Sequence, residues 1–481
     1  MSNERSDRTL SRRQLLAAGG GLGLAAVGAA AAANRWRGKV LRPLTGDPAA
    51  AAGYSSPAPT VYRHLIGSDG WISIPTGTLT NNLGLIVAPD TLAPAGKSTY
   101  IFGFRDVTEL DGGPTVKTSA TTTNPLILGQ KNKVQHSAPQ MFFDENDAIQ
   151  MTLTNLGLGQ RPDLTDPHTI HWHGFRNALP IFDGVPEMSI SVPIGRDFPF
   201  YYHPTDPGTY MYHCHNEDVE HVQMGMSGIV FVRPAQNKTG NGAGAPIARY
   251  NGGAATAPLG YTYNDGVAVS DPRSTAYDRE FGIFLSDFWA ESHYDDAHIQ
   301  VADWSDFHAD FYLMNGRSYP DTLAPNGGGT DLATGDLIAP SGRPDLQHQP
   351  LSSLIQCNAG DKVLLRIVNL GYTQPAMKLA GIAMHVIGKD ATLLRGLGTG
   401  GLRNGADTSY LTDTVYLGAG ESYEAIFTAP PKTGSGYDTY QLFNNSFGAL
   451  QKPGGSGLGG QMTEIRVYAA GTLPAQTAPN T

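Results

Sequence analysis

The sequence predicts an all-β protein built from two copies of one β domain. Glycine and proline supply 59 and 33 of the 481 residues and only 16% of residues are charged, so turns are frequent and long charged helices are few. Segments 147–157 and 361–371 share the pattern D-x-[IV]-x-[ML]-x-[LI]-x-N-L-G. Apolar residues alternate in both segments, which is typical of a half-buried strand that ends in a turn.

This repeat predicts two β domains at about 60–235 and 276–470. The intervening segment 236–275 is rich in Gly, Ala, Asn and Thr, which indicates a linker or a long surface loop. Residues 323–350 have the same character, and the last ten or so residues predict a loose tail.

The first 33 residues have the order of an export signal. Ser11-Arg12-Arg13-Gln14-Leu15-Leu16 precedes an uncharged Ala/Gly/Leu stretch that ends at Ala33. The arginine pair resembles the twin-arginine type, which implies export of an already folded bacterial protein to the periplasm or the extracellular space. A membrane anchor is the alternative, but the stretch is short and Gly/Ala-rich for a span of ~20 strongly apolar residues. No later stretch predicts a membrane span.

Charge and cysteine content exclude other classes. The net charge of −10 and the lack of a basic block in the body of the chain disfavour a nucleic-acid partner. Cys214 and Cys357 are too few for a disulfide framework. We expect Cys357, beside a turn before a predicted strand, to be a buried free thiol.

Histidines cluster in three short motifs of the first copy. They are Pro167-His168-Thr-Ile-His171-Trp-His173-Gly174, Tyr212-His213-Cys214-His215 and His221-Val-Gln-Met-Gly225-Met226. Neighbouring side chains of a strand point to opposite faces. His213 and His215 therefore share one face and Cys214 takes the other, and the same rule separates His171 and His173 from His168.

Two ligand sets follow from this alternation. His168, Cys214 and His221, with Met226 at longer range, make a His₂Cys site with a weak axial thioether, which suits blue copper. Met224 is a second axial candidate. The other set consists of four imidazoles that face away from the domain core: His171, His173, His213 and His215. The Cys214 backbone joins the two sets through a few covalent bonds and predicts an electron relay.

The motifs HTIHWHG, YHCH and HxxxGM, in this order, resemble those of the multicopper oxidases, laccase-like enzymes built of cupredoxin (Greek-key β-sandwich) domains. The resemblance implies copper as cofactor. It assigns residues to three copper types: His168, Cys214, His221 and Met226 to type 1, His171 to type 2, and His173, His213 and His215 to type 3. Asp183 in Phe182-Asp183-Gly184 resembles the family's acid near the type 2 copper, which assists proton delivery. An ordinary Asp-Gly turn is the alternative for Asp183.

The second copy lacks these ligands. Thr439-Tyr-Gln-Leu-Phe443-Asn444-Asn445 stands where the first copy has its H-C-H motif, and 376–381 stands where it has H-x-H. In this family the trinuclear cluster takes imidazoles from two domains, so the resemblance implies a homo-oligomer in which ligands of two chains meet. His385 is the alternative donor within the chain, but its apolar neighbours favour a packing role.

Two functional classes remain open at this stage. The first is an exported oxidase that takes single electrons at type 1 copper and passes them to a type 2/type 3 site, where oxygen is reduced to water. Its donor is a small molecule such as a phenol, a metal ion or a cytochrome. The second is a copper electron-transfer or nitrite-reductase-like protein without a full trinuclear cluster, although the aspartate of H-x-x-D-x-H is replaced by His171. A purely structural cupredoxin would not need the outward imidazoles.

Overall fold

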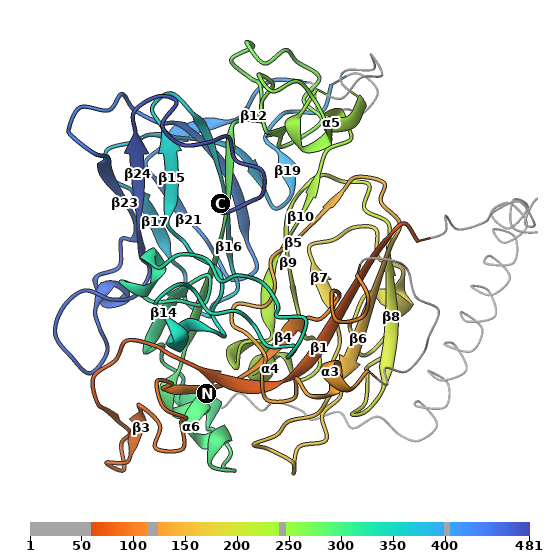
Figure 1. Cartoon of the computed structure of the whole chain (residues 1–481), viewed down its shortest axis with the longest axis vertical. Helices are drawn as coiled ribbons and strands as arrows, with labels where there is room; N and C mark the ends of the chain where they lie inside the picture. The colour runs from red at the N-terminus through yellow and green to blue at the C-terminus, as the bar shows by residue number, and fades with distance from the viewer. Residues whose placement is uncertain (1–58, 114–123, 240–246, 399–404) are drawn as a thin grey trace, which may run out of the picture. The chain divides into compact units, whose positions relative to one another are not determined.

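The computed structural model describes residues 59–113, 124–239, 247–398 and 405–481. The predicted export signal at 1–33 lies outside these residues. Strands dominate the described chain (Figure 1), where the longest helix is α6 (Ala290–Ala297), so the predicted all-β class is confirmed. Within the described ranges, no helix combines the length and the apolar character needed to cross a membrane.

The first half forms two four-stranded sheets. One has the order β4-β1-β6-β8 and the other β5-β10-β9-β7. Their strands are β1 (Val61–Ile72), β4 (Thr99–Asp106), β5 (Met141–Asp144), β6 (Ile149–Asn155), β7 (His171–His173), β8 (Asp197–Tyr202), β9 (Gly208–His213) and β10 (Ser227–Arg233). A small hairpin of β2 (Leu79–Thr80) and β3 (Ile86–Ala88) and the short helices α3 (Pro125–Leu128), α4 (Asp218–Gln223) and α5 (Gln236–Thr239) complete this half.

The second half repeats this plan. Its larger sheet has the order β14-β13-β16-β22-β18-β19, with β20 beside β18, and its smaller sheet has the order β15-β24-β23-β17-β21. The strands are β13 (Arg279–Phe288), β14 (Phe311–Met314), β15 (Ile355–Asn358), β16 (Lys362–Asn369), β17 (Ala376–Leu379), β18 (Met384–Lys389), β19 (Thr392–Leu393), β20 (Tyr410–Thr412), β21 (Thr414–Tyr416), β22 (Ser422–Thr428), β23 (Asp438–Asn444) and β24 (Met462–Tyr468).

The two halves share their strand pairing. β1 runs parallel to β6, as β13 does to β16, and β5 runs parallel to β10, as β15 does to β24. The repeated segments found in the sequence are β6 and β16. Alternate side chains of each sheet meet in a separate apolar core, and Cys214 belongs to the first core and Cys357 to the second. Both cysteines are free and buried.

Where the structure describes them, the segments expected to be loose make regular contacts. In the predicted linker, β11 (Gly260–Tyr261) pairs with β12 (Ala276–Tyr277), which directly follows the linker. The prediction of a loose C-terminal tail is wrong, because Gln476 and Asn480 are buried and hydrogen-bond to the backbone of Glu280 and Gly282. Glutamine and asparagine are polar residues, and the sequence did not reveal that β13 offers them partners.

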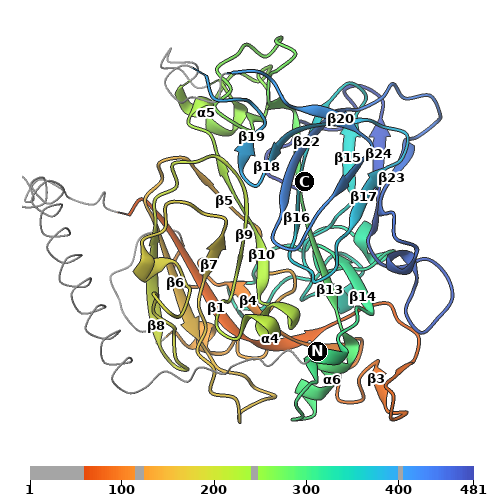
Figure 2. The same ribbon diagram turned by 180° about the vertical axis from the view of Figure 1, so that it is seen from behind.

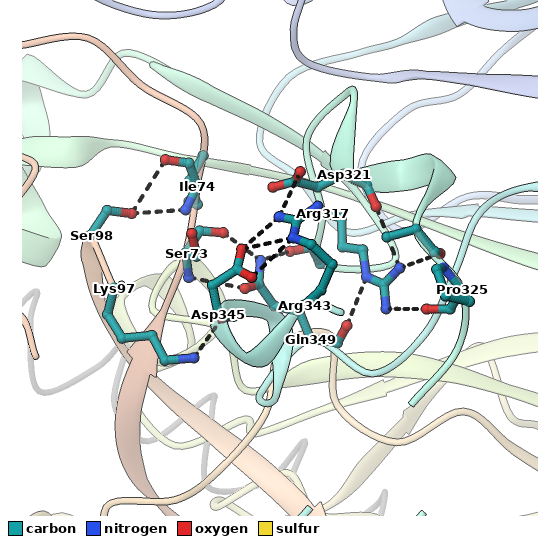
Figure 3. Close-up of polar contacts among 12 residues, drawn as sticks. Ser73, Ile74, Lys97, Ser98, Arg317, Asp321, Pro325, Arg343, Asp345 and Gln349 are labelled. Atoms are coloured by element: carbon teal, nitrogen blue, oxygen red, sulfur yellow. Dashed lines mark hydrogen bonds and ion pairs between the residues drawn. The ribbon is translucent and has the colours of Figure 1, made fainter. Parts of the chain in front are cut away.

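The long loop before β15 is fixed by charged side chains (Figure 3). Arg317 is fully buried and donates to the carbonyls of Ala324, Pro325 and Gln349. The Gln349 side chain in turn exchanges two hydrogen bonds with the backbone of Ser73, just after β1. Lys97 donates to the Asp345 carbonyl at 2.6 Å. The loop is therefore tied to the first half of the chain.

A buried ion pair of the second half lies next to β9, which lies beside β16 and β22 (Figure 2). Arg366 and Glu280 are both fully buried, and Arg366 Nε lies 2.6 Å from Glu280 Oε1. Arg366 also donates to Thr209 Oγ1, and the Thr209 N–H donates to Glu424. Ser422 donates to the Thr209 carbonyl. The second half thus holds the start of the strand that carries the H-C-H motif.

Buried histidines predict acid sensitivity of the copper-free protein. Burial lowers the pKa of His136 to about 3 and that of His293 to about 4, whereas the unfolded chain has ordinary values. Between about pH 6.5 and pH 4 the unfolded state therefore binds more protons, so stability falls as the pH falls. We expect His136→Gln to reduce this slope by about 1 kcal/mol per pH unit in denaturant titrations at pH 7 and pH 5. The exposed His308→Ala is the matched control, and equal slopes in all three proteins would contradict the prediction.

Candidate copper centres

The structure brings the thiol and two predicted histidine ligands together. Cys214 Sγ lies 3.3 Å from Nδ1 of His221 and 4.0 Å from Nδ1 of His168. All three side chains are buried, and their ligand atoms lie within 4.8 Å of one another. These three residues and Met226 are called the thiol set below.

Backbone hydrogen bonds explain why the thiol set converges. Cys214 follows β9, and its N–H donates to the Met226 carbonyl at 3.1 Å, which continues the pairing with β10. Glu217, with a left-handed φ of 47°, turns the chain into α4, which carries His221. The Met226 N–H donates back to the His221 carbonyl at 2.9 Å. His168 comes from a separate segment that bridges to Val192.

Met226 lies beside a predicted ligand. A Cβ at Gly67 would lie 2.8 Å from Cδ2 of His168 and 3.3 Å from Cε of Met226. The ring and the thioether methyl therefore border the same backbone position. Glycine at residue 67 leaves room for both side chains.

Charge in the thiol set favours a thiolate. Burial by itself raises the pKa of the Cys214 thiol, but His221 and His168 outweigh burial and hold this pKa well below its ordinary value. Conversely, burial lowers the pKa of His221, whereas the sulfur and Asp166 raise it overall. The Thr169 N–H lies 3.4 Å from Sγ and donates to it. A thiolate, two imidazole nitrogens and a thioether form a donor set that fits copper.

The second set consists of His171, His173, His213 and His215. β7 pairs with β9 so that His171 lies opposite His213, while Trp172 points into the core. The ligand atoms of His171, His173 and His213 lie within 4.8 Å of one another. The His215 ring lies 5.1 Å from that of His171 and 5.5 Å from that of His213, measured between centroids. The predicted alternation of β9 thus places these rings away from Cys214.

Hydrogen bonds orient the imidazoles of this set. His171 Nδ1 donates to the Asp183 carbonyl at 2.7 Å, and His213 Nδ1 donates to the Cys214 carbonyl at 2.8 Å. These bonds leave Nε2 of both rings free to bind a metal. Nδ1 of His173 lies 3.4 Å from Nε2 of His213. At His173 the other nitrogen is covered by the second half, since a Cβ at Gly420 would lie 2.7 Å from it.

The imidazoles of His171, His173 and His213 are neutral near pH 7. Burial and the neighbouring histidines lower the pKa of His173 and of His213, the latter to about 3. Burial also lowers the pKa of His171, and its contacts with Asp183 only partly offset this effect. Neutral imidazole is the form that binds metals, so these three side chains are ready to bind without losing protons.

Asp183 lies beside His171, as its predicted role requires. Its carboxylate Oδ2 is 3.6 Å from His171 Nδ1, and its side chain is 22% exposed. The half-buried carboxylate therefore connects the four-histidine set with solvent. A positive φ of 82° at Gly184 allows the turn after it, where a Cβ would lie 2.2 Å from the Ile170 carbonyl oxygen.

The second half carries different residues at the equivalent positions. β17 pairs with β23 so that Lys378 lies opposite Phe443, as His171 lies opposite His213 in the first half. His385 lies on β18, and its Nε2 is 2.7 Å from Ser409 Oγ. Two histidines outside the three motifs lie elsewhere: the His293 ring is buried against Phe288, and His298 Nε2 is 3.1 Å from Asp90 Oδ1. None of these belongs to a group of three metal-ligand side chains among the described residues.

Sequence reasoning missed two acidic residues next to the thiol set. Asp166 and Glu217 bring carboxylate oxygens within 4.8 Å of a ring nitrogen of His221 and of each other. Asp166 precedes Pro167, so the pair resembles an ordinary turn, and Glu217 stands in a run of exposed acids. Only the fold of the chain brings both carboxylates next to the His221 ring.

Comparisons with known proteins point to one family. Residues 127–237 match the multicopper oxidase family. Laccase-3 of Botryotinia fuckeliana is 22% identical over 346 residues, which cover 71% of this chain and 57% of the relative. Laccase ustL of Ustilaginoidea virens is 34% identical over 102 residues, which cover 21% of this chain and 14% of the relative. The chain therefore spans little more than half of the first relative and a smaller part of the second.

Solved structures show the same likeness. The multicopper oxidase mgLAC superposes with a TM-score of 0.51 at 19% identity, over 86% of this chain and 88% of that chain. The blue copper oxidase from Nitrosomonas europaea gives a TM-score of 0.49 at 20% identity, over 84% and 86%. The first likeness shows that the chain has a fold of cupredoxin-like domains. Because all eight predicted copper ligands lie within the matched segment, residues 127–237 carry the ligand motifs of the multicopper oxidase family.

Proposed function

We propose that this protein is a copper-dependent oxidase that takes single electrons from a reductant and reduces oxygen to water. One observation carries the proposal: the thiol set and the four-histidine set meet at the end of β9, where His213 and His215 flank Cys214. Copper bound to both sets would supply one-electron redox chemistry. The matched segment and the donor chemistry of both sets support this function.

The residues between the two sets provide a short route for electrons. His213 and His215 are each one peptide bond from Cys214, and His213 Nδ1 also donates to the Cys214 carbonyl. Thr169 makes a second connection, since its N–H donates to the sulfur and its Oγ1 accepts from the His215 N–H. Donor and oxygen can therefore react at separate places on the molecule.

Protons for oxygen reduction need a separate path. Asp183 is half-buried beside His171, on the face of β7 opposite Trp172. In the proposed function its carboxylate takes protons from solvent and delivers them next to the four-histidine set. The carbonyl of the same residue holds the His171 ring in place.

Oxygen uptake by the copper-loaded protein tests this function. With a reductant present, one oxygen should disappear for every four electrons supplied, and hydrogen peroxide should not accumulate. Turnover of nitrite without oxygen uptake would instead favour the nitrite-reductase-like alternative. Copper reduction without turnover of either acceptor would indicate a simple electron carrier.

The number of imidazoles that one chain offers indicates how chains assemble. One chain offers four imidazoles at the second set, and the second half offers Lys378 and Phe443 at the equivalent strand positions. The loop after β7, one of whose carbonyls binds His171, exposes Leu179, Ile181 and Met188. An exposed apolar group beside an open ligand set favours contact with a second copy.

We therefore predict a homo-oligomer in which ligands of two chains complete one copper site. Light-scattering mass and copper per chain, measured on the same copper-loaded sample, check this prediction. Met188→Lys, within the apolar loop, should shift the mass toward the monomer and lower the copper content, whereas Leu411→Lys, an exposed apolar site on β20, should change neither. A strict monomer with four coppers per chain would contradict the shared site.

Export is the remaining part of the proposal. Ser11-Arg12-Arg13 and the apolar stretch after it support a twin-arginine signal and a periplasmic or extracellular location. We predict that replacing both Arg12 and Arg13 by lysine leaves precursor in the cytoplasm of a bacterial host, because guanidinium and ammonium groups are not equivalent in recognition. Fractionation and immunoblotting of the full-length chain measure this. Arg5→Lys is the matched control, and normal export of the double variant would contradict the prediction.

A further inference from the structure

The second half of the chain contacts α4, the helix that carries one residue of the thiol set. The Tyr372 hydroxyl donates to the Val219 carbonyl at 2.5 Å, and the Trp289 N–H donates to the Gln223 side chain at 2.8 Å. Both contacts are made to α4 itself. Met226 lies beyond the end of this helix, so its position depends on other contacts.

His136, in the loop before β5, makes a contact at the Met226 end. Its Nδ1 lies 3.3 Å from the Gly225 carbonyl oxygen, and its Nε2 lies 3.0 Å from Oγ of Ser286 on β13. Gly225 directly precedes Met226 in the chain. Two hydrogen bonds through one imidazole therefore join the second half to the residue before the thioether.

The chemistry of the three groups fixes the direction of both hydrogen bonds. A carbonyl oxygen only accepts, so Nδ1 of His136 carries the proton and donates to Gly225. Burial lowers the pKa of His136 to about 3, which keeps the ring neutral near pH 7 and leaves Nε2 without a proton. Nε2 therefore accepts from the Ser286 hydroxyl. Both nitrogens of the ring are thus used in holding the loop.

Packing leaves the ring and the loop little freedom to move. His136 is fully buried, and its ring centroid lies 4.6 Å from that of Phe288. Gly225 has a φ of 117°, and a Cβ there would lie 2.8 Å from the Phe102 carbonyl oxygen and 3.0 Å from His136 Nδ1. The Gly225 backbone therefore packs directly against the imidazole, with no space for a side chain.

We propose that His136 is a positioning residue: through Gly225 it sets where the Met226 thioether lies in the thiol set, and thereby the reduction potential of copper bound there. The potential of such a site depends on its axial ligand and on the hydrogen bonds around the ligands. This role rests on the oxidase function proposed above, in which the thiol set takes up electrons. Through Ser286, the second half tunes a site to which it supplies no ligand.

Redox titration of the copper-loaded full-length protein, followed at its blue absorption, tests this role. His136→Phe removes both hydrogen bonds and lets the thioether move away, so oxidised copper is less stabilised. We expect about tenfold more reduced site at a fixed solution potential, which is a rise of about 59 mV for one electron. Ser286→Ala removes one hydrogen bond and should shift the potential less, in the same direction.

A conservative variant and a matched control separate positioning from general loosening. His136→Asn places an amide N–H close to the place of Nδ1 and should restore part of the potential. His64→Phe replaces another buried histidine of the first half, which contacts Asp111 and Thr154, and should leave the potential unchanged. The copper hyperfine splitting in electron paramagnetic resonance should change in His136→Phe and not in His64→Phe.

The outcomes distinguish this role from the oxidase function. If the parent protein is blue and both His136→Phe and Ser286→Ala keep its potential and spectrum, the positioning role is wrong and the oxidase function stands. An equal shift in His64→Phe would also overturn the positioning role. If the potentials shift as expected but the parent protein consumes no oxygen, the positioning role stands and the oxidase function is wrong.

Discussion

Cys214→Ser should abolish the blue colour of the copper-loaded protein. Strong visible absorption in such a site comes from the thiolate–copper bond, and Cys214 is the only thiol near His168 and His221. A serine hydroxyl at the same position is a hard, neutral ligand and cannot supply this bond. Oxygen uptake should fall to background with the colour, because the electron route begins at this sulfur.

Cys357→Ser is the matched control for this variant. Cys357 is also buried and free, but it belongs to the core of the second half, where burial raises the pKa of its thiol to about 12. The control should stay blue and active. A colourless parent protein with a full complement of copper, or a blue Cys214→Ser variant, would contradict the assignment of the thiol set.

His213→Ala should abolish most of the oxygen uptake but keep the blue colour. His213 lies opposite His171 and contributes Nε2 to the four-histidine set, while its neighbour Cys214 faces the other way. We expect oxygen uptake to fall about 100-fold or more, with less copper bound and the blue absorption retained. Oxygen electrode measurements, metal analysis and visible spectra of the same preparation test all three.

His385→Ala provides the comparison for this second variant. His385 binds Ser409 through Nε2 and lies on β18 of the second half, so its loss should leave copper content and oxygen uptake unchanged. Full oxygen uptake by His213→Ala would show that the outward imidazoles do not form the oxygen site. Loss of activity in His385→Ala would show that the second half supplies a ligand after all.

Local patterns predicted the fold and the grouping of both sets of side chains because neighbouring side chains of a strand point to opposite faces. Alternation along β9 separates Cys214 from His213, and the repeated D-x-[IV] segments are the equivalent strands β6 and β16. The four-histidine set lies on two neighbouring strands, so side-chain alternation and the pairing of β7 with β9 are enough to predict it. Composition predicted the all-β class because frequent turns leave little room for long helices.

Features that depend on distant contacts could not be predicted in this way. Gly420 covers His173 from the second half, and Asp166 meets Glu217 only because separate loops converge at His221. Likewise, segment 323–350 has the composition of a surface loop, but its backbone carbonyls bind the fully buried guanidinium of Arg317. Nothing in the local sequence shows which carbonyls lie within reach of that guanidinium.

The second half has the same strand pairing as the first but lacks the predicted ligands at the equivalent positions, and its contacts reach the strands of the first half. Arg366 and Glu424 hold Thr209 at the start of β9, and Gly420 covers His173. Both contacts reach the strands that carry the ligands. In the structure described here, the second half therefore positions the strands that carry the predicted copper ligands.

Anomalous X-ray scattering at the copper edge, from crystals of the copper-loaded protein, would locate the bound copper. We expect one peak among His168, Cys214, His221 and Met226, and further density at the imidazoles of His171, His173, His213 and His215. We also expect a second chain to contribute to the latter site. A crystal with no anomalous peak at Cys214, or with copper only on surface residues, would contradict both copper assignments.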